Sequence, residues 1–436
     1  MAALARPRPR FRVPAIMLLV ACAACTSTPA PRADRPTSEP ATAPSGSTAS
    51  PTPTSEAPTS AVIRSRGGSL LVRGAYPRVA SRCVRYRRPR LLARYPGTLS
   101  VKRSDDGTLA LTVTLPFEDY LEGIAEVPPS WPRAALEAQA IAARSYALAT
   151  TGWEGAEGEP LKTPICATTS CQVYRGIPVP FDASVRRWFA AVRRTSGEVL
   201  LYGDRPADTV YFSTSNGQTY GNDEVFGSAP LPYLRPVVER DDGASPVSHW
   251  NVRVPFDDLA SFLHEAGEWP PNRTISSVGL AGSTVTVRGE GGSRSMDLTT
   301  FRDAVNVWGP CLKPGRYPPP PLPVTLPSRW MTLSSDGGAA VAVGRGWGHG
   351  AGMVQWGAYG KALRGLSASD ILAYYYGGLR PQTYPEPGLI HVRVVSGLTS
   401  FRVVPSRPRA TLNGEALGSQ RVTITGGDQL TVTTRP

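Results

Sequence analysis

The sequence predicts an α+β fold: a mixed β-rich domain with a central Ala-rich helix, preceded by a disordered tether rich in Pro, Thr and Ser. Residues 26–62 carry almost no large apolar side chains, so they cannot bury a core. Residues 98–114 alternate apolar and polar side chains, which is typical of strands. Residues 131–150 repeat apolar side chains at helical spacing. The 436 residues suffice for two or three domains.

The chain begins with an export signal. Four arginines between positions 6 and 12 precede residues 13–24, an apolar run too short to span a bilayer. Residues 19–22, Leu-Val-Ala-Cys, resemble a bacterial lipobox, so we expect residues 1–25 to be a lipoprotein-type signal peptide with Cys22 acylated. Ordinary cleavage, which would release a secreted protein, is the alternative. Either way, we expect the protein on the outer face of the cytoplasmic membrane or in the cell-wall space.

The net charge is strongly positive. Of the formal +13, the first 62 residues supply +3 through six Arg and three acids, so the rest of the chain carries +10. Nucleic acid is a usual partner for such a charge, but an exported protein does not meet it. Anionic wall polymers and lipid head groups are the partners that this charge favours. An arginine-rich run at 82–94 concentrates the charge, and a solvated strand face also explains that run.

The first folded elements are strands followed by a helix. We expect strands near 69–73, 98–101 and 109–114, with the Asp106-Gly107 pair marking a hairpin turn. The helix follows, with Pro132 in its first turn and Ser130 as its cap. Arg144 lies on a face of this helix from which it can point toward the segment that precedes the helix.

The remainder alternates strands, loops and helices. We expect strands at 197–202 and 208–214, a loop-like region at 216–247, a helix near 255–267, strands near 276–288 and a helix at 367–376. We expect the catalytic domain to span 63–386, and residues 387–436 to form a small β-rich C-terminal tail.

Six cysteines are present. Cys22 belongs to the lipobox and Cys25 to the start of the tether, which leaves an even set in an exported protein and indicates two disulfides. We favour Cys166 with Cys171 and Cys83 with Cys311, although four cysteines allow three pairings. A zinc site is the alternative for the closely spaced pair, but the four histidines lie far from it in sequence, so we expect no metal and no cofactor.

Glu126 is the carboxylate that the sequence singles out. It stands among Ile124, Ala125, Val127 and Pro128, and an apolar setting favours the protonated form of a carboxyl, which can act as a general acid. A surface glutamate at the start of a helix is the alternative. The dipole of the following helix would favour the charged form instead.

Four blocks of the chain occur together in one order. They are 120–147 with Glu-Val-Pro before the Ala-rich helix, 171–176 (Cys-Gln-Val-Tyr-x-Gly), 211–219 (Tyr-Phe-Ser-Thr-Ser-Asn-Gly-x-Thr), and 344–378, where glycines alternate around His349. Together they resemble the SpoIID/LytB family over about residues 65–385. Glu126 is followed by Val where the family has Met, and the third block has Asn-Gly where Gly-Gly is usual.

The resemblance implies activity on the glycan of the bacterial cell wall. Members of the family are lytic transglycosylases that cleave peptide-stripped strands to 1,6-anhydromuramyl ends, and others enhance amidases. It implies that Glu126 is the general acid and base and that Arg144 is a second functional residue.

Neutral polar residues of the four blocks suit sugar hydroxyls and N-acetyl groups. We therefore expect peptidoglycan glycan strands as the substrate, an amidase or other wall hydrolase as a partner, and a membrane contact through the lipid anchor, with no nucleic acid. Two alternatives remain: a non-catalytic glycan-binding or amidase-enhancing protein, and a hydrolytic muramidase with Asp223, Glu224 or Asp241 as its second acid. The expected substrate-binding residues are Gln139, Gln172, Ser213, Thr214, Ser215, His349 and Gln355.

Overall fold

The structure is a computed structural model, and it describes residues 59–75, 91–155, 158–177, 184–317, 325–418 and 420–435. Helices and several separate sheets alternate along the chain, which confirms the α+β fold. The predicted signal peptide, Cys22 and nearly all of the predicted tether lie outside the described residues. In the part of the chain that the structure describes, no helix is long and apolar enough to cross a membrane.

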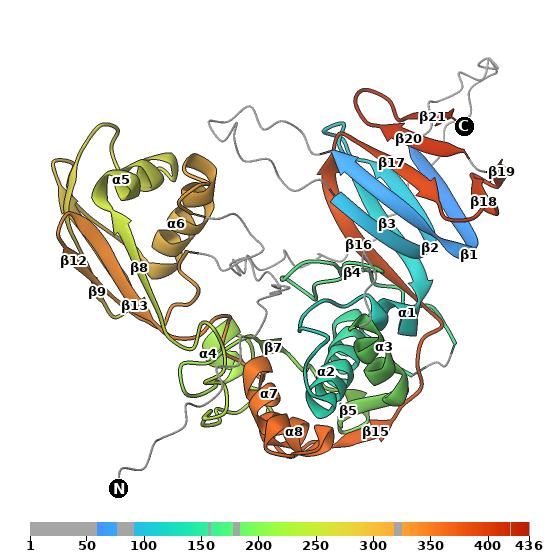
Figure 1. Cartoon of the computed structure of the whole chain (residues 1–436), viewed down its shortest axis with the longest axis horizontal. Coiled ribbons are helices and arrows are strands. Elements are labelled where there is room, and N and C mark those ends of the chain that lie inside the picture. Colours follow the sequence, from blue (N-terminus) through green and yellow to red (C-terminus); the bar gives the residue numbers. More distant parts are fainter. Residues whose placement is uncertain are drawn as a thin grey trace, which may run out of the picture.

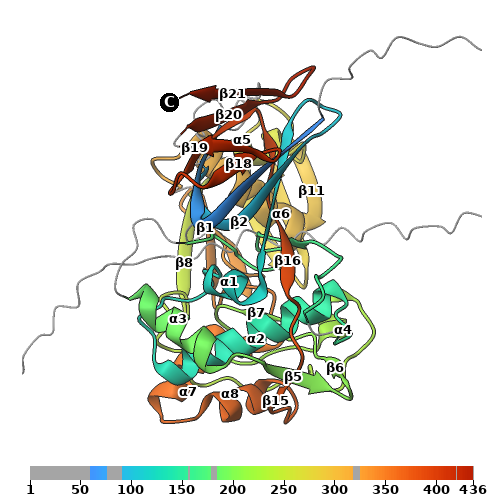
Figure 2. The same cartoon turned by 90° about the vertical axis from the view of Figure 1, so that its right-hand side faces the viewer.

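A ten-stranded sheet forms the upper layer of the molecule (Figures 1 and 2). It combines strands from both ends of the described chain, on either side of the boundary that the sequence places at 386 and 387. β3 pairs with β16, and β1 pairs with β17. Its strands run in the order β21-β20-β17-β1-β2-β3-β16-β4, with β18 beside β1 and β19 beside β18. The strands are β1 (Ser60–Ala75), β2 (Leu91–Arg103), β3 (Leu109–Pro116), β4 (Ile165–Cys166), β16 (Leu389–Leu398), β17 (Ser400–Pro405), β18 (Ala410–Leu412), β19 (Glu415–Gly418), β20 (Arg421–Thr425) and β21 (Thr431–Arg435).

The sheet buries one face through the alternation that the sequence shows. In β3, Leu109, Leu111, Val113 and Leu115 are fully buried, and the residues between them are partly exposed. The predicted hairpin is present, because β2 and β3 pair antiparallel around the turn at 104–108. β3 is followed directly by α1, where the chain passes from the sheet to the helices below it.

Helices and short strands form the second layer, beneath the sheet in Figure 2. β7 and β14 pair in parallel although about 140 residues separate them in the chain. The elements are α1 (Phe117–Glu122), α2 (Arg133–Thr151), α3 (Val185–Arg194), β5 (Glu198–Tyr202), β6 (Arg205–Pro206), β7 (Tyr211–Phe212), α4 (Asn222–Phe226), β14 (Met353–Val354), α7 (Gln355–Leu363), α8 (Ala368–Tyr375) and β15 (Pro381–Thr383).

α2 is the central helix that the alanines predict, and it is buried on nearly every side. Helices α3, α7 and α8 and strand β5 all pack against it, and its small side chains permit that close approach. The predicted cap is wrong. Pro132 is the N-cap, with no side-chain hydrogen bond, because its fixed φ of −55° already suits the position. Ser130 therefore lies before the helix start.

Residues 247–347, which lie between β7 and β14 in the chain, form a third part with its own hydrophobic core, at the left of Figure 1. The predicted helix and strands near 255–288 are present, whereas α6 here and α3 and α7 elsewhere were not predicted from the sequence. α6 begins at Asp297, whose carboxylate accepts a hydrogen bond from the Thr299 amide. The elements are β8 (Trp250–Pro255), α5 (Phe256–Glu265), β9 (Ile275–Ala281), β10 (Thr284–Gly289), β11 (Gly292–Asp297), α6 (Leu298–Leu312), β12 (Met331–Asp336) and β13 (Ala339–Gly344).

Candidate functional site

The segment that carries Glu126 is held by backbone pairing. After α1 ends, the Ala125 amide donates to the carbonyl of Val173 (2.9 Å), and the Arg175 amide donates to the carbonyl of Gly123 (2.9 Å). The chain at 123–126 thus lies beside 173–175 like a short strand. These bonds fix the backbone position from which the Glu126 side chain projects.

Gly123 is required for this close approach. A Cβ at this position would overlap the ring of Tyr174, and that ring cannot yield easily because it is stacked between Tyr95 and Tyr120. We expect Gly123→Ala to destabilise the protein by about 1–3 kcal/mol, the usual range for overpacking. Urea unfolding of the variant measures this loss. Unchanged stability would show that the pairing of the two segments is looser than described.

Glu126 is buried, with 8% of its surface exposed. Burial raises its pKa from 4.5 to about 7, although a hydrogen bond from the Val173 amide (2.6 Å) and the charge of Arg175 both act to lower it. Desolvation therefore outweighs both of these groups. The N-terminus of α2 lies further along the chain, at Arg133. Near neutral pH, Glu126 exists in both forms and can give up or accept a proton.

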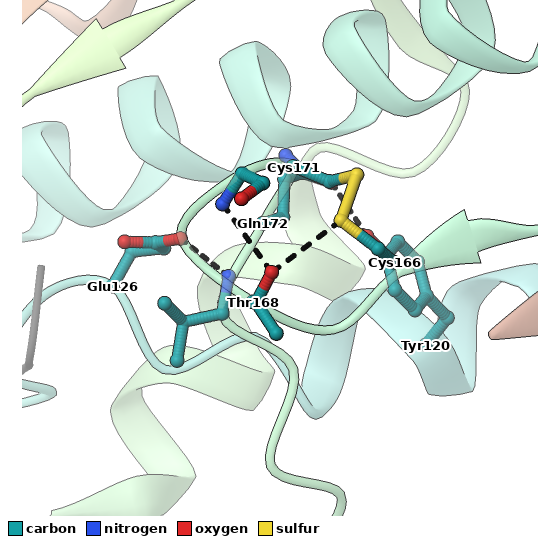
Figure 3. The surroundings of a disulfide bond; sticks show 8 residues. Tyr120, Glu126, Cys166, Thr168, Cys171 and Gln172 are labelled. Carbon is teal, nitrogen blue, oxygen red and sulfur yellow. Dashed lines mark hydrogen bonds between the residues drawn. A yellow bond between two sulfur atoms is a disulfide. The ribbon is translucent and has the colours of Figure 1, made fainter. Parts of the chain in front are cut away.

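A disulfide closes the loop that faces Glu126 (Figure 3). Cys166 at the end of β4 is bonded to Cys171, and the bridge is followed at once by Gln172 and Val173. Both sulfur atoms take part in the disulfide bond, so they are not zinc ligands in this structure. Cys311 is also disulfide-bonded, but Cys83, its predicted partner, lies outside the described residues.

The disulfide contributes to stability and to the position of Glu126. Closing a loop of about six residues stabilises a fold by about 2 kcal/mol in the chain-entropy model. We expect the double variant Cys166→Ser/Cys171→Ser to lose about that much in urea unfolding, and to show a lower pKa for Glu126 as water reaches the loosened loop. Cys311→Ser is the control for the pKa only, because it breaks a different disulfide and leaves this loop intact. A double variant with unchanged stability and pKa would contradict this role.

Gln172 is an internal residue of the site, fully buried and bonded at both ends of its amide. Its Oε1 accepts from the hydroxyl of Tyr120 (2.6 Å), and its Nε2 donates to the Ala143 carbonyl (3.0 Å) and to the hydroxyl of Tyr211 (3.0 Å). It therefore ties the disulfide loop to α1, α2 and β7. No donor remains on this amide for a substrate.

Gln139 and Gln355 meet between α2 and α7. The Gln355 amide nitrogen donates to Oε1 of Gln139 (3.3 Å), and both side chains are buried. Nε2 of Gln139 is buried and has no hydrogen-bond partner among the described residues. An unpaired buried donor costs free energy, and because only 1% of Gln139 is exposed, this amide belongs to the packing between α2 and α7. The predicted substrate contact through Gln139 stays a prediction.

The three hydroxyl residues of the third block follow β7 and are buried. The hydroxyl of Thr214 is bonded to Ser245 (2.6 Å) and lies 3.2 Å from that of Ser213. The Ser215 amide and hydroxyl both donate to the Asp242 carboxylate (2.7 Å each). Asp242 and Ser245 lie in the region that the sequence leaves as loop, and no pattern there indicated them.

His349 is held by the backbone on both sides of its ring. The Ala351 amide donates to Nδ1 (3.1 Å), so Nε2 carries the hydrogen and donates to the Tyr211 carbonyl (2.9 Å). Burial lowers the pKa of His349 to about 4, so the ring is neutral near pH 7. The geometry favours an internal role for His349 over the predicted substrate contact, because both ring nitrogens are occupied.

Arg144 is fully buried and points toward α1, the element before its helix. Its guanidinium pairs with Glu118 (2.8 Å) and with Glu386 (2.8 Å), and it also donates to the Val192 and Glu198 carbonyls. With no exposed surface, Arg144 makes its contacts inside the protein. Its guanidinium forms an ion-pair cluster with Glu118 and Glu386, and the functional role that the resemblance implies stays a prediction.

Glu118 shares the pKa range of Glu126, and burial is the largest cause for both. Burial raises the pKa of Glu118 to about 7, and the nearby Glu386 raises it further, while Arg144 opposes both. Near neutral pH, Glu118 therefore exists in both its protonated and its ionised form. Glu118 could not be found from the sequence, because its partner Glu386 is 268 residues away.

Comparisons with known proteins agree with the four blocks. The family model described as Stage II sporulation protein matches residues 105–202, which include Glu126, Arg144 and the disulfide loop. Stage II sporulation protein D of Bacillus subtilis is 30% identical over 273 residues, covering 61% of this chain and 74% of that protein. A protein of Brachyspira hyodysenteriae is 31% identical over 293 residues, covering 65% of this chain and 71% of that protein.

A further relative carries a different name. The protein named Amidase enhancer from Bacillus subtilis is 28% identical over 296 residues, which cover 59% of this chain and 39% of that protein. The similarity to the sporulation proteins covers about three quarters of their length and includes the region around the buried glutamate. The chain therefore belongs to the SpoIID/LytB family.

Proposed function

We propose that this protein acts on the bacterial cell wall as a peptidoglycan lytic transglycosylase, with Glu126 as both general acid and general base. The observation that carries the proposal is the buried carboxyl of Glu126, whose pKa of about 7 lets it give and retake a proton near neutral pH. The names of the sporulation and amidase-enhancer relatives support a role at the wall.

The reaction needs one carboxyl. Glu126 gives its proton to the bridging oxygen as the glycosidic bond breaks, and the leaving sugar departs as an alcohol. The 6-hydroxyl of the muramyl residue then attacks its own anomeric carbon, and the Glu126 carboxylate takes the hydroxyl proton. The product carries a 1,6-anhydro ring, and Glu126 is again protonated, so protons balance over the cycle.

Nearby side chains supply groups that suit a sugar chain. Trp131, Trp356 and Tyr359 form an aromatic cluster with ring centroids 4.9–5.3 Å apart, and Trp356 and Tyr359 keep part of their surface exposed. We assign these residues to binding of the glycan.

Hydrolysis by a second acid has less support. Lys361 and Arg364 bind Asp241 and hold its pKa below the usual range even though burial acts to raise it. Asp223 and Glu224 are exposed on α4. A second candidate function, enhancement of an amidase, rests on the relative of that name.

Localisation and partners follow from the proposed substrate. We propose that the protein is held at the outer face of the membrane through Cys22, within reach of glycan strands and of a wall hydrolase. Labelling with a radioactive fatty acid tests this, because a Cys22→Ser variant would lose the label if this cysteine is the acylated one.

The proposed activity is tested by incubating the purified protein with glycan strands, with and without stem peptides, in the absence of any amidase. Release of soluble fragments by the protein alone supports cleavage. If fragments appear only when an amidase is added, and the amidase then works faster, the enhancer function replaces the proposed one.

A further inference from the structure

Tyr211 is a second polar side chain beside Glu126, and three contacts fix its place. Its backbone carbonyl accepts from Nε2 of His349 (2.9 Å), which anchors β7 to the glycine-rich fourth block. Its ring packs edge-on against that of Tyr146 from α2, with centroids 6.4 Å apart. Its hydroxyl oxygen accepts from Nε2 of Gln172 (3.0 Å). The side chain is thus immobilised at both ends.

The hydrogen-bond chemistry of Gln172 determines where the proton of Tyr211 can go. The amide nitrogen must face Ala143, because the Ala143 carbonyl can only accept, and the amide oxygen is taken by the hydroxyl of Tyr120. The remaining N–H of Gln172 therefore donates to the oxygen of Tyr211. The hydroxyl proton of Tyr211 cannot be donated back to Gln172, and no other described residue accepts it.

Tyr211 and Glu126 are bound to adjacent residues of the disulfide loop, the hydroxyl of Tyr211 to Gln172 (3.0 Å) and the carboxyl of Glu126 to the Val173 amide (2.6 Å). Burial raises the pKa of Tyr211 well above 10, and the negative charge of Glu126 raises it further, so this hydroxyl keeps its proton. Glu126 acts on the pKa of Tyr120 as well. Tyr120 is completely buried, however, whereas Tyr211 retains exposed surface.

We propose that Tyr211 is a second catalytic residue, whose hydroxyl donates a hydrogen bond to a sugar oxygen at the linkage that Glu126 protonates. The inference rests on the proposed function and adds to it a neutral donor that the fold supplies from β7. Gln172 and His349 are its positioning residues. This role explains why both residues have polar side chains although neither has a group free to bind the substrate.

The role of this donor is electrostatic. Tyr211 transfers no proton during the cycle, and its hydrogen bond strengthens as negative charge develops on the sugar oxygen. A fixed donor of this kind acts mainly on the transition state, so its removal lowers kcat more than it changes KM.

The test is Tyr211→Phe, compared with wild type, Tyr174→Phe and Glu126→Gln on peptide-stripped glycan strands. Tyr174 is the matched control, because its hydroxyl is buried without a partner among the described residues, so the same change there removes no bond. We expect Tyr211→Phe to lower kcat by about 10²-fold, with KM within about twofold of wild type, and Tyr174→Phe to retain wild-type kcat. Melting temperatures establish that each variant is folded.

The outcomes separate this inference from the proposed function. If Glu126→Gln is inactive while folded Tyr211→Phe keeps a kcat within about twofold of wild type, Tyr211 is not catalytic and the proposed function stands. If Tyr211→Phe raises KM and leaves kcat unchanged, Tyr211 only binds substrate and its catalytic assignment is wrong. If wild type itself cleaves nothing, the proposed function and this inference both fail.

Discussion

Glu126→Gln is expected to lower the rate of glycan cleavage by about 10²- to 10⁴-fold, the usual contribution of a general acid and base. Glutamine has nearly the same shape and can still accept the hydrogen bond from the Val173 amide, so the site keeps its geometry. It has no proton to give to the bridging oxygen. The rate of formation of new glycan ends from peptide-stripped strands measures the effect.

Glu118→Gln is the matched control. Glu118 has a pKa of about 7 as well, but its carboxyl is bound to Arg144 between α1 and α2. We expect this variant to cleave glycan at the wild-type rate. Equal loss of activity in both variants would mean that charge in this region, and not Glu126 as the proton donor, is what cleavage requires.

Wild type and Glu126→Gln should differ in how cleavage and stability depend on pH. The acid form of Glu126 is lost as the pH rises through about 7, so wild-type cleavage falls above this pH. Because the folded pKa lies above its usual value of 4.5, folding takes up a proton between these pH values and stability falls as the pH rises across them. The difference between a pKa of 4.5 and a pKa of about 7 corresponds to about 3 kcal/mol of unfolding free energy. Glu126→Gln should lose this part of the dependence while Glu118 keeps its own.

Arg144→Met is expected to destabilise the protein by about 3 kcal/mol, the low end of the range for a broken buried pair, because it leaves the half-buried Glu118 and Glu386 together without a cation. Methionine fills most of the space that the arginine side chain occupies but carries no charge. The loss should be greatest at high pH, where both carboxyls are ionised. Urea unfolding at pH 6 and pH 8 measures it.

The triple variant Arg144→Met/Glu118→Gln/Glu386→Gln serves as the control, since it removes the unpaired charges together with the arginine. We expect it to recover most of the lost stability. If Arg144→Met instead kept full stability and lost only cleavage, the arginine would act in the chemistry, as the resemblance implies, and its assignment to the ion-pair cluster would be wrong.

Local patterns predicted the elements around the site well. The alanines and apolar spacing predicted α2, and the Asp-Gly pair predicted the β2–β3 hairpin, because both signals depend on neighbours in sequence. The apolar neighbours of Glu126 also indicated a raised pKa, although the sequence did not show that the segment at 173–175 pairs with 123–126 and binds the carboxyl.

Features that depend on distant residues could not be predicted. The cap was assigned to Ser130 because serine is a common cap, whereas a proline with suitable φ needs no side-chain bond. The partner of Arg144 at position 386 and the partner of Ser215 at position 242 come from loops without a periodic pattern. His349 and Gln172 have residue types that suit substrates, and only the structure reveals that their polar atoms are already engaged.

The central claim is that Glu126 closes an anhydro ring instead of activating water. The most direct measurement is the mass of the new glycan ends formed from purified strands in H₂¹⁸O. The account predicts ends that lack one water and carry no ¹⁸O, formed by wild type and absent with Glu126→Gln. Reducing ends labelled with ¹⁸O would contradict it and identify the protein as a hydrolase.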